Sequence, residues 1–250
     1  MAGDARLLTG DAVWSLAEYL DVPAVLEAAA AEAASSAGSS APTTPPGCTG
    51  GDLDTTVHCD PVTGERVRLP TAVLCALRAA GCAASAARRL LPANVLTVGV
   101  VGPAPVVWWH VAVLCRHIRT VTHVAVATDV SAAPIRLADQ LDLAGVGLSI
   151  TDTAPAAAFG ANLVVAAGPA PITGDRIVAG ALLVEAVPGA FPRALHARAR
   201  VVLSADAKGL AMDGGGFTVV TAPIRTAHLD AALAAEIAAV DTRMALTQRE

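Results

Sequence analysis

The sequence predicts an α/β fold with a doubly wound parallel sheet, and two observations support this prediction. Short apolar runs bounded by turn residues recur along the middle of the chain, as in strands that are buried on both faces. Helical stretches separate these runs, and an alternation of strand and helix is typical of parallel sheets. We therefore expect a Rossmann-like domain whose sheet covers residues 94 to about 203.

The elements of this domain follow from the apolar runs and the breaks between them. We expect strands at 95–101, 121–127, 147–150 and 162–166, and further strands within 177–187, 201–203 and 217–220. Helices are expected at 105–117, 133–143, 155–159 and 229–247, the last with an alanine-rich face. We assign residues 94–250 to this domain, with the last helix as its C-terminal element.

A reduced N-terminal α+β region is expected over residues 1–93, of the kind that serves substrate binding or dimerisation. Residues 9–34 read as helical, and Thr9 or Asp11 can cap the start. Residues 35–51 are rich in serine, proline, glycine and threonine, and we expect a flexible linker there. Residues 55–59 and 66–69 flank a turn with Pro61 and Gly64, which predicts a β-hairpin before a long helix at 71–91.

Composition excludes several classes of protein. Hydrophobic residues make up 54% of the 250 residues and charged residues 16%, so the chain can bury a sizeable core. The net charge is -5 and no basic block is present, which argues against a nucleic-acid partner. No uninterrupted apolar run is long enough to cross a membrane, and the first residues lack the layout of a signal peptide. We expect a cytoplasmic protein.

Cysteine and histidine spacing gives no sign of a metal site. The five cysteines are odd in number and contain no Cys-x-x-Cys, so neither zinc binding nor a disulfide framework is indicated. His110 and His117 share a helix face without a carboxylate or cysteine to complete a ligand set, and a structural role is the better interpretation. Cys75 and Cys82 are interpreted as small core residues.

The loop after the first strand departs from the pattern that holds phosphate. A dinucleotide-binding fold has Gly-x-Gly-x-x-Gly there, because glycine permits the tight turn and the close approach of backbone to pyrophosphate. Gly102 matches the first glycine, but Ala104 stands at the second, where its methyl group crowds a phosphate. Pro103 and Pro105 also remove two N–H donors. We therefore expect no cofactor, with NAD(P) as the alternative.

An acidic residue follows the second strand. Asp129 stands where an acid can accept hydrogen bonds from the adenosine ribose of a dinucleotide. The alternative is that Asp129 only caps or solvates the end of the strand. The candidate cofactor-binding residues are thus Gly102, Ala104 and Asp129.

Several segments resemble the ornithine cyclodeaminase / mu-crystallin family. Residues 6–13 resemble its start, residues 60–65 its turn before a helix that carries an arginine, residues 77–80 its Arg-Thr-Ala-Ala stretch, and residues 96–102 its first Rossmann strand. The resemblance implies NAD(H)- or NADP(H)-dependent interconversion of amino acids and imines, usually by dimers. It further implies a lysine and an arginine that hold substrate, and an aspartate in acid/base chemistry.

The catalytic set that the resemblance implies is incomplete. The single lysine, Lys208, lies beyond the position of the family's lysine, Ala190 stands nearest the aspartate, and Val106 replaces a glutamine. Arg78 is the one catalytic candidate that remains. It either binds a carboxylate through a bidentate fork or is a surface or interface arginine with a buried stem.

These departures give two functional hypotheses. In the first, a degenerate and shortened cyclodeaminase-like protein, a pseudoenzyme, has lost its redox chemistry. It then acts as a helper subunit or non-redox tailoring protein in secondary metabolism, that is, in the biosynthesis of amino-acid-derived compounds. In the second, the protein is an NAD(P)-dependent imine reductase or cyclodeaminase-type enzyme with an unusual loop. We expect a homodimer or a complex with a biosynthetic enzyme, because a shortened substrate region leaves apolar surface to cover. A small amino-acid-derived ligand is the expected small-molecule partner.

Overall fold

The computed structural model describes residues 5–36, 55–60, 63–92, 94, 96–204, 216–221 and 227–247. The chain forms two compact units. The first comprises Met1–Arg78 and Arg225–Glu250, and the second comprises Ala79–Ile224. Most of the linker expected at 35–51 lies outside the described residues.

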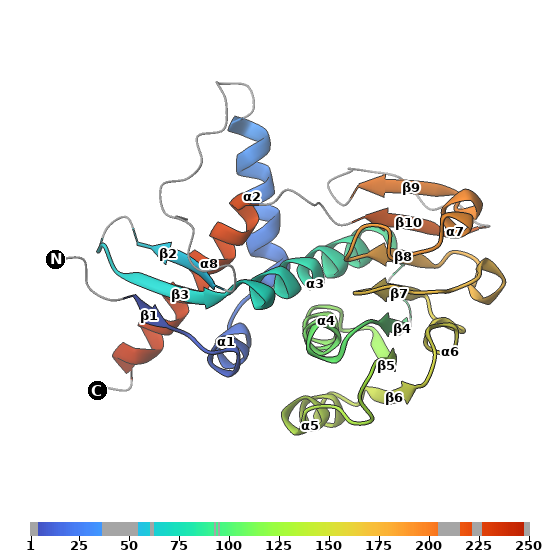
Figure 1. Ribbon diagram of the computed structural model, residues 1–250, viewed down its shortest axis with the longest axis horizontal. Helices are drawn as coiled ribbons and strands as arrows, with labels where there is room; N and C mark the ends of the chain where they lie inside the picture. Colours follow the sequence, from blue (N-terminus) through green and yellow to red (C-terminus); the bar gives the residue numbers. More distant parts are fainter. Residues whose placement is uncertain are drawn as a thin grey trace. The chain divides into compact units, whose positions relative to one another are not determined.

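The second unit contains a seven-stranded sheet in which every strand pair is parallel (Figure 1). Its order is β6-β5-β4-β7-β8-β10-β9. The strands are β4 (Leu96–Val101), β5 (Val121–Ala127), β6 (Gly147–Thr151), β7 (Leu163–Ala166), β8 (Leu182–Glu185), β9 (Val201–Ser204) and β10 (Thr218–Thr221). This confirms the Rossmann-like doubly wound sheet. The direction of strand addition reverses between β4 and β7, which is the topological switch point where such folds bind ligands.

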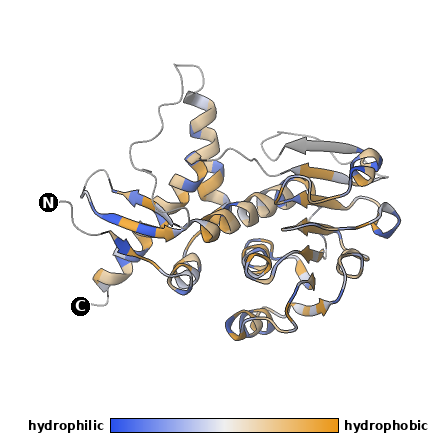
Figure 2. Ribbon diagram, viewed as in Figure 1, coloured by the Kyte–Doolittle hydropathy of each residue, from blue (hydrophilic) through white to orange (hydrophobic). Residues whose placement is uncertain are grey.

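The sheet is apolar because it is covered on both faces. Every residue of β7 and β8 is buried, and Figure 2 shows the apolar character of these strands. The helices of this unit are α4 (Ala104–His117), α5 (Ile135–Leu143), α6 (Ala154–Ala158) and α7 (Arg193–Arg198), with a 3-10 turn η1 (Gly174–Arg176). Alanines of α6 pack against β4 and β5, and α4 buries three of its four valines and both of its tryptophans.

The first unit is a small α+β assembly. Its sheet has the order β1-β3-β2, with β1 (Arg6–Leu7) parallel to β3 (Arg66–Pro70) and β2 (Thr55–Cys59) antiparallel to it. The predicted hairpin is therefore present. Its remaining elements are α1 (Gly10–Ala17), α2 (Val22–Ser36), the start of α3 (Thr71–Leu90) and α8 (Ala227–Thr247).

The helical character expected over residues 9–34 is confirmed, and the stretch is divided into two helices. Thr9 caps α1 by accepting a hydrogen bond from the Ala12 N–H. Asp21 accepts from the Ala24 N–H at 3.1 Å, which begins α2 anew. Pro23 lies in the first turn of α2, where a missing N–H costs nothing.

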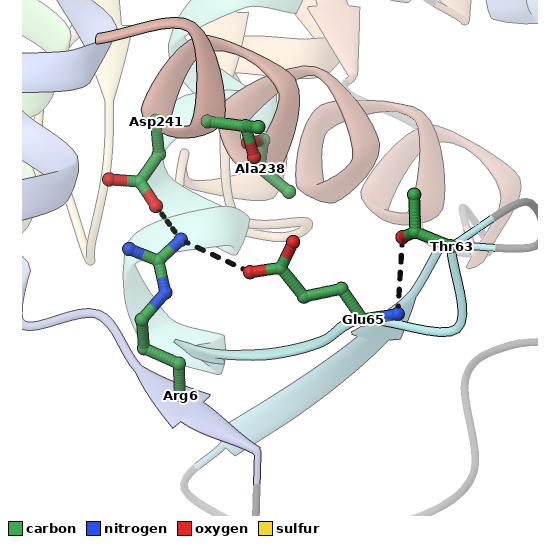
Figure 3. Close-up of polar contacts among 6 residues, drawn as sticks. Arg6, Thr63, Glu65, Ala238 and Asp241 are labelled. Carbon is green, nitrogen blue, oxygen red and sulfur yellow. Dashed lines mark hydrogen bonds and ion pairs between the residues drawn. The ribbon is translucent and has the colours of Figure 1, made fainter. Parts of the chain in front are cut away.

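The C-terminal helix belongs to a different unit from the one that the sequence suggested. We assigned it to the Rossmann-like domain, but α8 packs against α1, α2 and β2 of the first unit. Figure 3 shows a further contact of α8, in which the guanidinium of Arg6 on β1 lies between the carboxylates of Asp241 on α8 and Glu65 beside β3. Among the described residues, no helix is long and apolar enough to cross a membrane.

Candidate functional site

The carboxyl ends of the central strands form the candidate site in the second unit. Val101, Ala127, Ala166 and Glu185 pair in one row across β5, β4, β7 and β8. The chain leaves β4 through Gly102, whose φ is +152°. A Cβ at Gly102 would lie 2.9 Å from the Ala167 carbonyl carbon, so only glycine allows the loops after β4 and β7 to approach this closely.

The N–H groups at the start of α4 already have partners. Pro103 precedes the helix, and Pro105 stands in its first turn without an N–H. The N–H groups of Val106 and Val107 both donate to the Pro103 carbonyl. The Ala104 N–H donates to Asp129 Oδ1 at 2.8 Å. The start of α4 therefore offers few direct hydrogen bonds to a phosphate.

Asp129 joins the end of β5 to this loop. Its carboxylate accepts from the Ala104 N–H, which is the main cause that lowers its pKa, and from the Thr128 hydroxyl at 3.1 Å. The residue is nevertheless exposed. A carboxylate has about four acceptor sites, so Asp129 can keep the Ala104 N–H and still accept from ribose hydroxyls. Both interpretations of Asp129 are thus compatible, and the site fits the adenosine-ribose part of a dinucleotide.

The structure brings the three predicted cofactor-binding residues together. Gly102, Ala104 and Asp129 lie at one edge of the sheet, joined by the contact between Ala104 and Asp129. Arg78 belongs to the first unit instead. Its Nε donates to Asp230 Oδ1 of α8 at 2.8 Å. Burial alone lowers the pKa of Arg78, but the charge and hydrogen bond of Asp230 raise it on balance.

Of the residues set aside as structural, His110 and Cys82 are buried, whereas Cys75 and His117 are half-buried. His110 is fully buried, and its Nδ1 lies 2.9 Å from the Val106 carbonyl oxygen. Burial lowers the pKa of His110 to about 4, so the ring is neutral. Cys82 is buried as well, and burial raises the pKa of Cys115 to about 12. The described residues contain no group of three or more histidine, cysteine and acidic side chains that could hold a metal.

A second acid at the same edge was not anticipated. Glu185 ends β8 and is 2% exposed. Its Oε1 accepts from the Phe191 N–H at 3.0 Å and its Oε2 from the Thr221 hydroxyl at 3.0 Å. His196 Nε2 of α7 lies 3.2 Å from Oε1, within ion-pair distance but off the line of a well-formed hydrogen bond. An acid that closes an apolar strand was the available signal in the sequence.

Comparison with solved structures identifies the fold. The chain is 17% identical to CmnK, with a TM-score of 0.69 over 96% of each chain. An archaeal alanine dehydrogenase dimer with bound NAD is 14% identical, with a TM-score of 0.65 over 98% of this chain and 97% of that one. The Δ1-pyrroline-2-carboxylate reductase of Thermococcus litoralis, in complex with NADH and L-proline, is 13% identical. Its TM-score is 0.58 over 76% of this chain and 72% of that one.

Two further structures share this fold at low identity. They are an iminosuccinate reductase of Paracoccus denitrificans with NAD+, 16% identical, and a lysine cyclodeaminase, 19% identical. No protein-family model and no curated protein matches the sequence.

These comparisons correct the expectation that no cofactor binds. Solved chains of this fold hold NAD or NADH. The altered loop alone was therefore too narrow a basis for excluding a dinucleotide. The expected resemblance is confirmed at the level of the fold: the chain has the fold of the ornithine cyclodeaminase / mu-crystallin-like proteins.

Proposed function

We propose that the protein is an NAD(P)-dependent oxidoreductase that reduces the C=N bond of a small imine or oxidises the corresponding amino acid. The observation that carries this proposal is the position of Asp129, which bridges β5 and the β4–α4 loop at the switch point. The fold supports it, since the solved chains that share it include two imine reductases, an amino-acid dehydrogenase and a cyclodeaminase.

Each residue of the loop has a defined part in this proposal. Asp129 accepts from the ribose hydroxyls while it holds the start of α4. Gly102 keeps the backbone free of a side chain at the crevice between β4 and β7. A bound reduced dinucleotide supplies the hydride that the imine carbon receives. An acid at position 129 also repels the additional phosphate of NADPH, which favours NADH.

Equilibrium binding tests the proposal directly. Trp108 and Trp109 lie in α4, so their fluorescence reports dinucleotide at this edge. We expect NADH to bind at least tenfold more tightly than NADPH. Asp129→Asn should weaken NADH binding about tenfold or more, because a hydrogen bond to a charged group contributes roughly 1.5–3 kcal/mol. Asp139→Asn, on the exposed side of α5, is the matched control and should leave the affinity unchanged.

Activity is tested with the two imines that related folds reduce. Loss of NADH absorbance with Δ1-pyrroline-2-carboxylate or iminosuccinate as substrate would support imine reduction. The reverse assay offers NAD+ with L-proline, L-alanine and L-aspartate. A protein that binds neither dinucleotide and turns over neither imine would refute the proposal.

A further inference from the structure

A cavity of about 250 Å³ lies in the first unit, between the β2–β3 hairpin and α8. The hairpin contributes His58 and Asp60 from one arm and Glu65 and Val67 from the other. His58 lies opposite Val67 in the strand ladder, and the Asp60 N–H donates to the Glu65 carbonyl at 2.9 Å. Because alternate residues of a strand share a face, all four side chains belong to the face that lines the cavity. The cavity is distinct from the dinucleotide loop, which belongs to the second unit.

Small side chains on α8 leave this space open. Ala235, Ala238 and Ala239 line the cavity at the spacing of a single helix face, and Thr242 continues that face by one turn. The Thr242 hydroxyl donates to the Ala238 carbonyl at 3.0 Å, so it presents lone pairs rather than a proton to the cavity. Cavities that bind drug-sized molecules measure roughly 300–1,000 Å³, so this one suits a smaller molecule.

The cavity is apolar at one end and acidic at the other. Val67 is buried beside the alanines of α8, whereas Glu65 lies toward the turn of the hairpin. Figure 3 shows the Glu65 carboxylate extending from the hairpin toward Arg6. This pair is loose, at 3.8 Å, because the same guanidinium is held by Asp241 of α8. The Glu65 side chain is 49% exposed, so its carboxylate can also accept a hydrogen bond from a ligand.

The lining offers negative charge and hydrogen-bond acceptors. Against the carboxylates of Asp60 and Glu65 it contains one guanidinium, that of Arg243, which donates to Glu236 at 3.1 Å. Burial lowers the pKa of His58, although the charge of Asp60 opposes this, so the ring is neutral at pH 7. In the part of the chain that the structure describes, no three such side chains lie close enough together to hold a metal ion. The charge and the acceptors therefore favour an organic cation.

We propose that this cavity binds a small primary ammonium ion that carries a short alkyl chain. The ammonium group lies at the acidic end and donates to the Glu65 carboxylate, with Asp60 adding its negative charge. The alkyl chain packs along Val67 and the alanines of α8. This inference does not rest on the proposed function, because it concerns a second site in the other unit.

Binding followed at His58 tests the site, with n-butylammonium as the probe. In protein labelled with ¹³C at histidine Cε1, the His58 signal is assigned by its loss in His58→Gln. At pH 7.5 (roughly one unit above the ordinary pKa of histidine) the probe should shift this signal with a dissociation constant on the order of 1 mM. The signal of His228, at an exposed position of α8, should stay in place. 1-Butanol lacks the charge and butyrate reverses it, and both should bind about tenfold more weakly or worse.

Two variants test the acidic end and the space separately. Glu65→Gln keeps the size of the side chain and removes its charge, and should weaken binding about tenfold. Ala239→Leu fills the cavity and should abolish the shift. Glu32→Gln and Ala30→Leu, at exposed positions of α2 in the same unit, are the matched controls and should bind the probe as the wild-type protein does.

Thermal unfolding of each variant shows whether it is folded. Glu65 is half-exposed, so Glu65→Gln keeps the test decisive even if Ala239→Leu does not fold. The inference is overturned if the His58 signal does not move or does not saturate, or if 1-butanol binds as tightly as n-butylammonium. It is equally overturned if a folded Glu65→Gln or Ala239→Leu protein binds the probe as the wild-type protein does. None of these measurements involves a dinucleotide, so the proposed function is judged separately.

Discussion

Acid should destabilise the protein through His110 on α4. The ring is fully buried, its Nδ1 faces the Val106 carbonyl, and its Nε2 has no partner among the described residues. Burial lowers the pKa of His110 from its ordinary 6.5 to about 4. The folded state therefore binds the proton less well than the unfolded chain. The stability that this neutral ring allows is present above about pH 6.5 and is lost as the pH falls toward 4.

The size of this effect follows from the shift. Each pKa unit corresponds to about 1.4 kcal/mol, so the full loss is roughly 3 kcal/mol and the loss between pH 7 and pH 5 is about 2 kcal/mol. This loss is measured by urea unfolding at each pH. The signal is the fluorescence of Trp108 and Trp109, which precede His110 in α4. Leucine is similar in volume to histidine. Between pH 7 and pH 5, the His110→Leu variant should therefore lose about 2 kcal/mol less of its free energy of unfolding than the wild-type protein loses. His228→Leu, at an exposed site, should not. If the free energy of unfolding falls equally in the wild-type protein and in His110→Leu, the argument from burial is refuted.

Three further measurements address the loop, the arginine and the assembly. Gly102→Ala should destabilise the second unit by about 1–3 kcal/mol, because the added Cβ would meet backbone at 2.9 Å. Gly160→Ala is the control: Gly160 also has a positive φ, but nothing lies within 4 Å of an added Cβ, so this variant measures the cost of the φ angle without the clash. A double-mutant cycle of Arg78→Met with Asp230→Asn should give a coupling of about 1 kcal/mol in thermal unfolding if the pair is structural, and a coupling near zero would count against that role. Light scattering tests the expected homodimer, which a clean monomer would contradict, and co-purification tests a heteromeric partner.

The sequence predicted the elements of the sheet better than their arrangement. Strands such as 96–101 and 121–127 are apolar runs between turn residues, and that signal is local. The insertion of β10 between β8 and β9 was not predictable in this way, because strand pairing is decided by contacts between distant residues. The placement of α8 failed for the same reason. Its alanine-rich face marks a helix but does not say which surface the helix covers.

The candidate site was predictable where its residues lie near a recognisable loop. Gly102, Ala104 and Asp129 could be named as candidates because a dinucleotide-binding fold fixes their distance from the first two strands, and the structure brings them together. The contact between Glu185 and His196, which lie 3.2 Å apart, was not predicted. No sequence pattern joins an acid at the end of a strand to a histidine on the following helix. Long-range packing of α7 near β8 brings these two side chains together.

The structure also changes the meaning of the two prolines in the cofactor loop. Pro103 precedes α4 and Pro105 stands in its first turn, where helix N–H groups have no helical partner in any case. They therefore fix the backbone of the loop without removing a helical hydrogen bond. Asp129 takes the Ala104 N–H, and its negative charge lies at the positive end of the helix. If the proposed function is right, we expect such a loop to select a dinucleotide by its ribose more than by its pyrophosphate, because the additional phosphate of NADPH would meet the carboxylate of Asp129. The ratio of the NADH and NADPH affinities therefore tests the site better than the NADH affinity alone. In Asp129→Asn this ratio should fall toward one.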